Sequence, residues 1–438
     1  MREAKVDVVI AMVEKDASIL REIIEYLNSD IRTIRSNAIL VLGELGEKAA
    51  IATSQLMECL DDEDWSICRE AIRTLGKIGP ASKETIPKLS NLLKDKEVLI
   101  RKAAATALGK IGTATDVAIS SLIGALKDNN EEIRMEAAKT LGKIGPDAHA
   151  AVKNLVKCLK DPNWAVRTAS AEAISGIGKG SLKAIPTLIN ILDDTDWRVR
   201  YKAIDTLVQI GKEVIPDILK IINHKNSIIR MGAIETLGEL KIADPKIIKS
   251  IAALLKDNIE GVRGKAADAL RSIGKETIPE LNNIYEELDK EGKILVISAI
   301  GGMGTEAHEA IPLLIKSLEE NRTSIRVEAA RALGNVCSGE KNALSALELA
   351  LTDSKSKVRR VAAMSLGKIG PKASSSIPVL INLINDKKAD VRWRTAEALG
   401  RFKINNIQII SALENLLYDK LDYVATAAQE ALDEITGE

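Results

Sequence analysis

One arginine recurs along the chain at a nearly constant spacing. The marker is Arg200 in the stretch DWRVRYKAIDTL, and equivalent positions follow at steps of 33 residues, except for two steps of 30 that lead into Arg230 and Lys293. The thirteen marker positions are Arg35, Cys68, Arg101, Arg134, Arg167, Arg200, Arg230, Arg263, Lys293, Arg326, Arg359, Arg392 and Ala425. A period of about 20–50 residues is typical of solenoids and other repeat arrays. We therefore expect one structural unit used thirteen times, which we call repeats 1 to 13.

Each repeat contains two stretches with the apolar spacing of a helix. In the second stretch the apolar residues lie at −1, +3, +4, +7 and +10 from the marker. At about 100° per residue these positions form one stripe along a helix. In repeat 6 they are Val199, Ala203, Ile204, Leu207 and Ile210. The open side of this second helix is then centred on −2, +1, +5 and +9, with −3 at its rim.

Proline and glycine indicate where these helices begin and end. Several first helices begin with a proline, which a first turn tolerates because its N–H is not needed there; these are Pro87, Pro186, Pro216, Pro279, Pro312 and Pro378. Glycines at +8 and +11, such as Gly76 and Gly79, are expected to end the second helix, because a left-handed C-terminal residue favours glycine. The usual Ala at +3 is expected to allow close approach between neighbouring helices.

The combined motif is a proline, an aspartate eight residues on, and Val-Arg ending fourteen residues after the proline. Pro186, Asp194, Val199 and Arg200 fit it in full. This pattern resembles the HEAT repeat, in its short bilin-lyase-like form, over residues 16–438. The resemblance implies an all-α fold, an α–α superhelix of helical hairpins, with the second helix of each pair lining the concave face. Residues 1–15 are expected to form a capping helix before the first repeat.

An acid stands six residues before most markers. These acids are Asp62, Asp95, Asp128, Asp161, Asp194, Asp257, Glu287, Glu320, Asp353, Asp386 and Asp419, and the exceptions are Ser29 and His224. HEAT families pair this acid with the marker arginine of a neighbouring repeat. The first repeat lacks the acid and the last lacks the arginine, which indicates that each arginine reaches forward. We predict the pairs Arg167–Asp194 and Arg359–Asp386.

Two places depart from the regular repeat. The 30-residue steps are expected to shorten the turns at Gly211–Pro216 and Gly274–Pro279. Repeat 9 reads DKEGKILVISAIGGMG, with Lys293 at the marker and four glycines. Because glycine raises backbone freedom, we hypothesise a soft seam at residues 285–304. The alternative is a local change of curvature without a hinge.

Composition excludes several classes of function. Lys+Arg and Asp+Glu both number 62, which argues against a protein held to nucleic acid or membrane by bulk charge. The four cysteines are scattered without a CxxC pair, as expected of reduced core residues in the cytoplasm. No apolar run is long enough to span a membrane. No zinc-ligand spacing, phosphate loop or nucleophile elbow occurs, so we expect no catalytic residues, no metal and no cofactor.

Function in a solenoid is expected where the repeats differ. All four tryptophans lie on the open side or at its rim, and Tyr201 lies on it at +1. Repeats 5 to 8 carry an acid at +5, beside these rings, and the repeats on either side are basic. Tryptophan at −3 is typically packed over the turn, whereas Tyr201 is the better candidate for contact with a partner. The candidate binding residues are Trp164, Trp197, Tyr201, Glu172, Asp205, Glu235, Asp268, Arg69, Arg73, Lys102, Arg360 and Trp393.

The sequence favours a monomeric, non-enzymatic scaffold that binds a protein or peptide on its concave face. Repeating carboxylates beside rings suit a partner with a basic segment, through ion pairs and cation–π contacts. Two alternatives stay open. One is a lyase-like or cofactor-maturation factor of the bilin-lyase type. The other is nucleic-acid binding through the basic repeats, which predicts a steep salt dependence.

Overall fold

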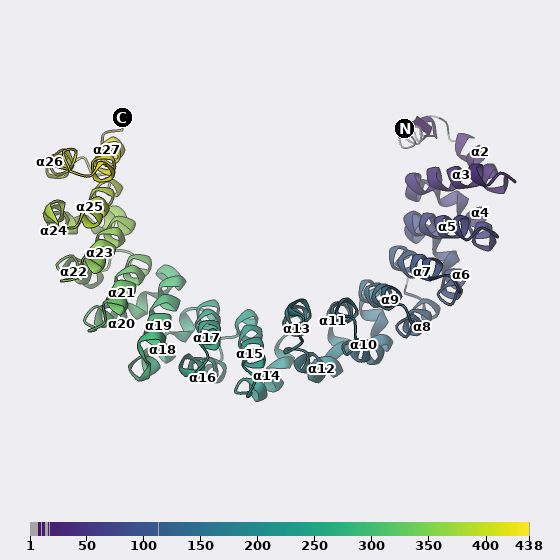
Figure 1. The fold of residues 1–438 in the computed structure, drawn as a ribbon, viewed down its shortest axis with the longest axis horizontal. Helices are drawn as coiled ribbons and strands as arrows, with labels where there is room; N and C mark the ends of the chain where they lie inside the picture. The colour runs from purple at the N-terminus through teal and green to yellow at the C-terminus, as the bar shows by residue number, and fades with distance from the viewer. Residues whose placement is uncertain (1–7, 10, 14–15, 17, 113, 438) are drawn as a thin grey trace. The chain divides into compact units, whose positions relative to one another are not determined.

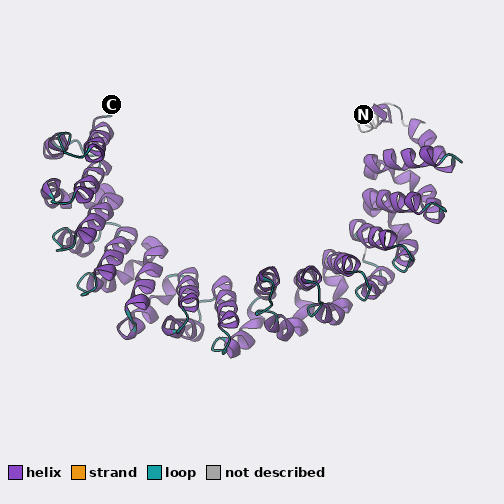
Figure 2. Cartoon of the chain, in the orientation of Figure 1, coloured by secondary structure: helices purple, strands orange, loops and turns teal. Residues whose placement is uncertain are grey.

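The computed structural model describes residues 8–9, 11–13, 16, 18–112 and 114–437, and these contain helices and loops but no strand (Figure 2). The all-α class is therefore confirmed. Within the expected capping helix over residues 1–15, residues 8–9 and 11–13 are helical. The other residues of that helix lie outside the described residues. The chain divides into two compact halves, residues 1–218 and 219–438.

In the N-terminal half, first and second helices alternate along the chain and form two layers. The first helices are α2 (Ser18–Glu25), α4 (Thr53–Glu58), α6 (Ile86–Leu92), α8 (Asp116–Ala125), α10 (Val152–Cys158) and α12 (Ile185–Asn190). The second helices are α3 (Arg32–Leu45), α5 (Trp65–Ile78), α7 (Val98–Ile111), α9 (Glu131–Ile144), α11 (Trp164–Ile177) and α13 (Trp197–Ile210). Within this half the second helices line the inner side of the curve (Figure 1). Helix α14 (Ile215–Ile221) spans the division.

The C-terminal half has the same two layers. Its first helices are α16 (Pro245–Ala253), α18 (Ile278–Ile284), α20 (Ile311–Ser317), α22 (Lys341–Ala350), α24 (Ile377–Ile381) and α26 (Ile407–Leu416). Its second helices are α15 (Ser227–Leu240), α17 (Glu260–Ile273), α19 (Lys290–Met303), α21 (Thr323–Val336), α23 (Ser356–Ile369), α25 (Ala389–Arg401) and α27 (Asp422–Thr436). Within this half too, the second helices form the inner layer (Figure 1).

The apolar stripe of each second helix faces the first-helix layer and forms the core. In α13 the side chains of Val199, Ala203 and Leu207 are fully buried. All four cysteines are buried and free, and burial raises the pKa of the Cys59 thiol to about 11. The core therefore follows the predicted stripe, and its cysteines belong to it.

The two recurring glycines have different roles, which corrects part of the sequence interpretation. The second helix ends at +10, and the glycine at +11 caps it with a positive φ, as at Gly79 (φ 72°) and Gly211 (φ 95°). The glycine at +8 lies inside the helix. A Cβ on Gly142 would stand 2.7 Å from the Cα of Ala173 on the next second helix. The +8 glycine therefore allows close approach between neighbouring second helices and does not end them.

The 30-residue steps shorten the turns as predicted. In several regular repeats the second helix is joined to the first helix of the next repeat through a seven-residue 3₁₀ segment, such as Gly145–Ala151 or Gly370–Ser376. After α13 and α17 the segment has only three residues, Lys212–Val214 and Lys275–Thr277. The missing residues are thus removed from the connection and not from the second helices, which keep 14 residues.

The arginine–acid ladder runs forward, as predicted. Arg167 Nη2 lies 2.7 Å from Asp194 Oδ1, and Arg359 Nε lies 2.7 Å from Asp386 Oδ2. The other pairs are Arg35–Asp62, Arg101–Asp128, Arg134–Asp161, Arg230–Asp257, Lys293–Glu320, Arg326–Asp353 and Arg392–Asp419. The hydrogen-bonded partners in each pair are 27 residues apart. Each forms a bridge between consecutive repeats.

Each ladder arginine also holds its own turn together. Arg134 Nη1 donates to the carbonyls of Asp128, at 2.8 Å, and Asn129, at 3.1 Å. The acid in turn accepts from a backbone N–H two residues on, as Asp161 does from Asn163 at 2.9 Å. One guanidinium therefore fixes the turn before its helix and the turn of the following repeat.

The ladder is interrupted at three markers. Cys68 offers no cation to Asp95, whose carboxylate accepts only from the backbone N–H of Glu97 among the described contacts. Arg200 bonds to the carbonyls of Asp194 and Thr195 and has no carboxylate partner within the described residues. Arg263 bonds to the Asp257 carbonyl, and its buried Nε makes no hydrogen bond. The last two arginines precede the 30-residue steps.

At residues 285–304, repeat 9 has its own set of contacts. Tyr285 is buried, and its hydroxyl lies 2.9 Å from the Ser317 hydroxyl. The Lys293 ammonium lies 2.6 Å from Glu320 and 4.8 Å from the centre of the Tyr285 ring. The division between the two halves falls at 218/219. The soft seam at 285–304 stays a prediction.

Candidate functional site

The exposed aromatic pair Trp197 and Tyr201 stands at the start of α13. Their exposed fractions are 65% and 60%. Helix α13 begins there because the Asp196 side chain caps it, accepting from the backbone N–H of Arg198 at 2.9 Å. The Arg198 guanidinium donates to the same carboxylate at 2.6 and 2.9 Å and lowers the pKa of Asp196 to about 2. The cap is therefore charged at neutral pH, and it fixes the point from which both rings project.

Trp164 occupies the same position in repeat 5, yet it is covered. The Arg198 guanidinium carbon lies 3.3 Å from the centre of the Trp164 ring, which is 38% exposed. Trp197 has no ring or cation contact within the described residues, and the sequence places Ile228, not a cation, at the corresponding −2 position of the next repeat. Packing of tryptophan at −3 over the turn stays a prediction. The contact of Trp164 is with a side chain of the next repeat, and Trp197 has none of this kind among the described residues.

The acidic residues at +5 do not form a free acidic surface. Asp205 lies 3.1 Å from Lys202, Glu235 lies 2.8 Å from Lys265, and Asp268 lies 2.8 Å from Arg271. Glu172 is exposed and has no ion pair within the described chain. Glu172 and Asp205 belong to the N-terminal half and the other two acids to the C-terminal half. The structure therefore brings only Glu172 and Asp205 together with the aromatic pair.

A groove crosses the second helices of the N-terminal half, and its residues on α13 are Lys202, Asp205 and Gln209, which follow Tyr201 along the helix. Its volume is about 500 Å³. The lining residues come from α9, α11 and α13: Lys139, Gly142, Lys143, Glu172, Ala173, Ser175, Gly176, Lys202, Asp205 and Gln209. Its floor is low because the backbones approach closely: a Cβ on Gly176 would stand 2.5 Å from the Gly142 carbonyl oxygen. An extended chain could lie close to this floor.

The basic residues proposed from the sequence are largely paired. Arg69 and Arg73 share Glu70, at 2.8 and 3.2 Å, and Lys102 lies 2.8 Å from Glu132. Arg73 and Lys102 line a second groove of about 250 Å³ between α5 and α7, together with Leu99, Thr106, Lys77 and Lys110. The predicted basic flank is thus an exposed surface, but most of its predicted cations already have an acidic neighbour.

Sequence reasoning left the unpaired lysines out of the candidate site. Lys110, Lys139 and Lys143 are exposed and form no ion pair within the part of the chain that the structure describes. The sequence contains a pattern that could have identified them at position +9. In repeats 1 to 5 this position holds Glu44, then lysine in three successive repeats, then Gly176. The first of these lysines, Lys77, lies 2.7 Å from Glu44. The next two have no acid at the corresponding position to meet.

In the C-terminal half, Trp393 belongs to a packed cluster. Its ring meets Tyr423 edge-on, with the centroids 5.8 Å apart, and the Arg394 guanidinium lies 3.8 Å from its centre. Arg360 lies 3.6 Å from Asp390, whose carboxylate also accepts from the Tyr423 hydroxyl at 3.2 Å. These candidate residues support one another, and none of them lies near the groove residues of the N-terminal half in sequence.

The described residues contain neither a metal-binding cluster nor a helix that could span a membrane. No group of three or more His, Cys, Asp or Glu side chains among them could hold a metal ion. In the same residues, no helix has the length and apolar character needed to cross a bilayer.

Comparisons with known proteins concern the fold. A family model described as HEAT repeats matches seven overlapping segments that together run from residue 53 to residue 433. No curated protein matches the chain. Among solved structures, the karyopherin Kap121p bound to Nup53p is similar, with a TM-score of 0.61, 15% identity, and coverage of 95% of this chain and 53% of that one.

Two further solved structures show the same likeness. Kap121p bound to the extreme C-terminus of the phosphatase Cdc14p has a TM-score of 0.56 and 15% identity, with coverage of 96% of this chain and 50% of that one. Kap95p, from a study of its binding to RanGDP, has a TM-score of 0.50 and 13% identity, with coverage of 95% and 66%. The chain spans about half the length of the Kap121p chains it matches. At these identities the likeness shows the fold alone.

Proposed function

Because this chain belongs to the HEAT-repeat family, we propose that it is a non-enzymatic scaffold that binds a protein or peptide on the second-helix face of its N-terminal half. Solenoids present extended surfaces of this kind, and their function resides where the repeats differ. Among the repeats of this half, only repeat 6 has an aromatic side chain at both −3 and +1, at the start of α13.

The observation that carries the proposal is the exposure of Trp197 and Tyr201 on one helix turn. Large exposed aromatic side chains beside a groove are typical of the anchors of protein interfaces. The start of α13, from which both rings project, is fixed by the Asp196 cap, and the Arg198 guanidinium is held by Asp196 and lies over the Trp164 ring. A partner that covers them would remove apolar surface from water without first ordering the helix, which lowers the entropic cost of binding.

The sequence also led to predictions about the charge of the partner, the oligomeric state, the location and the absence of enzymatic activity. A partner recognised through a free run of acids is less well supported, because three of the four acids have a cation beside them. A monomeric state and a cytoplasmic location stay predictions, as does the absence of enzymatic activity. No specific observation favours the lyase-like alternative.

The proposal is tested by quantitative affinity capture with the full chain. Wild type is compared with Trp197→Ser/Tyr201→Ser and with a matched control, Tyr418→Ser. Tyr418 is 90% exposed and follows α26 in the first-helix layer of the C-terminal half. We expect the captured proteins to be lost about tenfold or more with the double variant, the scale of an interface anchor, and to be kept with the control. Equal recovery with all three proteins would overturn the proposal.

A further inference from the structure

Three lysines without an ion pair among the described residues stand on two neighbouring second helices of the N-terminal half. Lys110 lies on α7, and Lys139 and Lys143 lie on α9. All three are exposed, and none forms an ion pair within the described residues. By contrast, Lys77 lies 2.7 Å from Glu44 and Lys102 lies 2.8 Å from Glu132.

The register of the repeats explains why Lys110 and Lys143 have no acidic partner. At +9, side chains of consecutive second helices can reach one another, as the 2.7 Å contact between Lys77 and Glu44 shows. The +9 positions of the next repeats are Lys110 and Lys143, followed by Gly176. Like charges one repeat apart repel each other, so this arrangement disfavours the free protein unless an anion lies between them.

We propose that α7 and α9 bind an acidic extended peptide segment of another protein, which continues across the groove toward Trp197 and Tyr201. This inference rests on the proposed scaffold function and names the chemistry of its partner. It reverses the sign of the partner expected from the sequence, because three of the four acids at +5 have a cation beside them and these lysines have no acid among the described residues.

The spacing of the helices fixes the spacing of the acids. Packed helices are about 8–10 Å apart, and an extended chain rises about 3.3 Å per residue, so one repeat corresponds to about three residues. Acids three residues apart would meet Lys110 and then the pair Lys139 and Lys143. About six residues further, the peptide would reach α13, two repeats on, where an apolar side chain would cover the aromatic pair.

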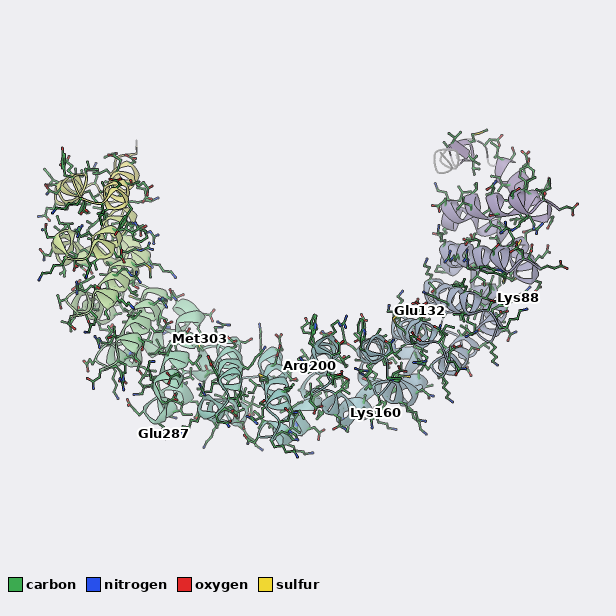
Figure 3. The ribbon with its side chains drawn as sticks, viewed as in Figure 1. Lys88, Glu132, Lys160, Arg200, Glu287 and Met303 are labelled. Atoms are coloured by element: carbon green, nitrogen blue, oxygen red, sulfur yellow. The ribbon has the colours of Figure 1, made fainter. Side chains whose placement is uncertain are left out.

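A peptide fits this surface better than a nucleic acid. The lysines share the face with carboxylates: Glu132 and Glu136 on α9 and the unpaired Glu172 on α11. A continuous phosphate backbone would meet these acids, whereas a peptide can place neutral residues over them. Glu172 stands between the lysines and the aromatic pair, which is why we expect acids at only one end of the segment. Glu132 projects on the inner side of α9 in Figure 3.

The test uses defined peptides and fluorescence anisotropy. The probe is a labelled peptide of about twelve residues with Glu at positions 1 and 4, Leu at position 10, and Ser, Gly and Gln elsewhere. Its reversed sequence tests both directions, and the same peptides with Gln or Lys in place of Glu test charge. A single-stranded DNA of about twelve nucleotides is the fourth ligand. We expect one Glu peptide to bind at least tenfold more tightly than its Gln counterpart, and more tightly than the DNA.

The matched variants separate a local site from bulk charge. Lys110→Glu/Lys139→Glu/Lys143→Glu is compared with Lys153→Glu/Lys157→Glu/Lys160→Glu, which makes the same change of net charge on exposed lysines of the outer layer, at and after α10. Lys160 projects outward in Figure 3. We expect the first variant to weaken binding of the Glu peptide about tenfold or more and the second to leave it within about twofold.

Several outcomes would overturn the inference. They are equal binding of the Glu and Gln peptides, no binding of either, tighter binding of the DNA, or the same loss with both triple variants. The comparison of the peptides on the wild-type protein tests the inference even where a variant fails to fold. If no acidic peptide binds while protein capture still depends on Trp197 and Tyr201, the acidic partner is excluded and the scaffold proposal stands. If the acidic peptide binds tightly while protein capture does not depend on Trp197 and Tyr201, the acidic partner stands and the role proposed for the aromatic pair is excluded.

Discussion

Repeats 3 to 5 and repeat 8 contain the same arginine, but only the former bind the acid that follows. Arg101, Arg134 and Arg167 each meet an aspartate 27 residues on. In the sequence, Glu287 is 24 residues after Arg263, and it pairs instead with Lys256. The difference is the turn, which is three residues shorter. An acid of the right type is therefore not sufficient: a ladder pair also needs the connection length that places it.

The largest effect is expected where regular repeats pack most closely. Gly142→Leu places a side chain where even a Cβ would stand 2.7 Å from the Ala173 Cα, so we expect a loss of about 3 kcal/mol or more in unfolding free energy. The matched change in repeat 8 is Gly264→Ala in α17, where nothing lies within 4 Å, and it should gain about 0.5–1 kcal/mol. Urea unfolding of both variants measures the contrast. A similar loss in both would refute the role given to the +8 glycine.

The next effect compares a complete ladder pair with an incomplete one. Arg134→Ala leaves the half-buried Asp161 carboxylate without its cation and should cost about 2–3 kcal/mol. Arg263→Ala removes one bond to the Asp257 carbonyl together with an unsatisfied Nε, so it should cost less than about 1 kcal/mol. Chemical unfolding midpoints decide the order. Equal losses would mean that the acid contributes nothing to the ladder.

A third experiment builds a missing pair. Cys68→Arg restores a cation 27 residues before Asp95, in a repeat of regular length, and we expect a gain of about 0.5–1 kcal/mol. The double variant Cys68→Arg/Asp95→Asn should lose that gain. A double-mutant cycle by urea unfolding measures the coupling, and a coupling of zero would show that the 27-residue spacing alone does not create the pair.

The smallest effect concerns pH. The Arg392 guanidinium holds the pKa of Asp419 below its ordinary value. A lowered folded pKa gives stability that is present above the unfolded pKa of about 3.9 and is lost as pH falls through the folded value. Asp419→Asn should therefore be less stable than wild type by up to about 1 kcal/mol at pH 7, and the difference should shrink below about pH 4. Thermal unfolding from pH 7 to pH 2 tests this. Asp95→Asn, an acid without an arginine, should show a smaller difference at pH 7.

The repeat, the forward direction of the ladder and the shortened turns could all be predicted, because each follows from spacing along the chain. The role of the +8 glycine could not. Its partner is the +6 residue of the next repeat, as Ala173 is for Gly142, and a helix-ending role explains the same residue type. Interhelical packing decides between the two readings.

The candidate site was predictable only in part. The pairs Lys202–Asp205 and Arg271–Asp268 are three residues apart on one helix and could have been read from the sequence. Glu235 meets Lys265 on the next helix, which the sequence does not specify. Trp164 is 38% exposed and Trp197 65%, and of the two only Trp164 has a cation over its ring among the described residues. The sequence shows which residue types are present and not which of them meet.

The arginine that holds its own turn has a consequence for synthesis. Because Nη1 of Arg134 is bonded to the carbonyls of Asp128 and Asn129, its guanidinium is oriented by residues that precede it in the chain. A domain made on the ribosome folds from its N-terminus as residues emerge. Each finished repeat therefore offers an oriented cation before its acid, 27 residues later, has left the exit tunnel. We therefore expect the repeats that form ladder pairs to dock in chain order during synthesis.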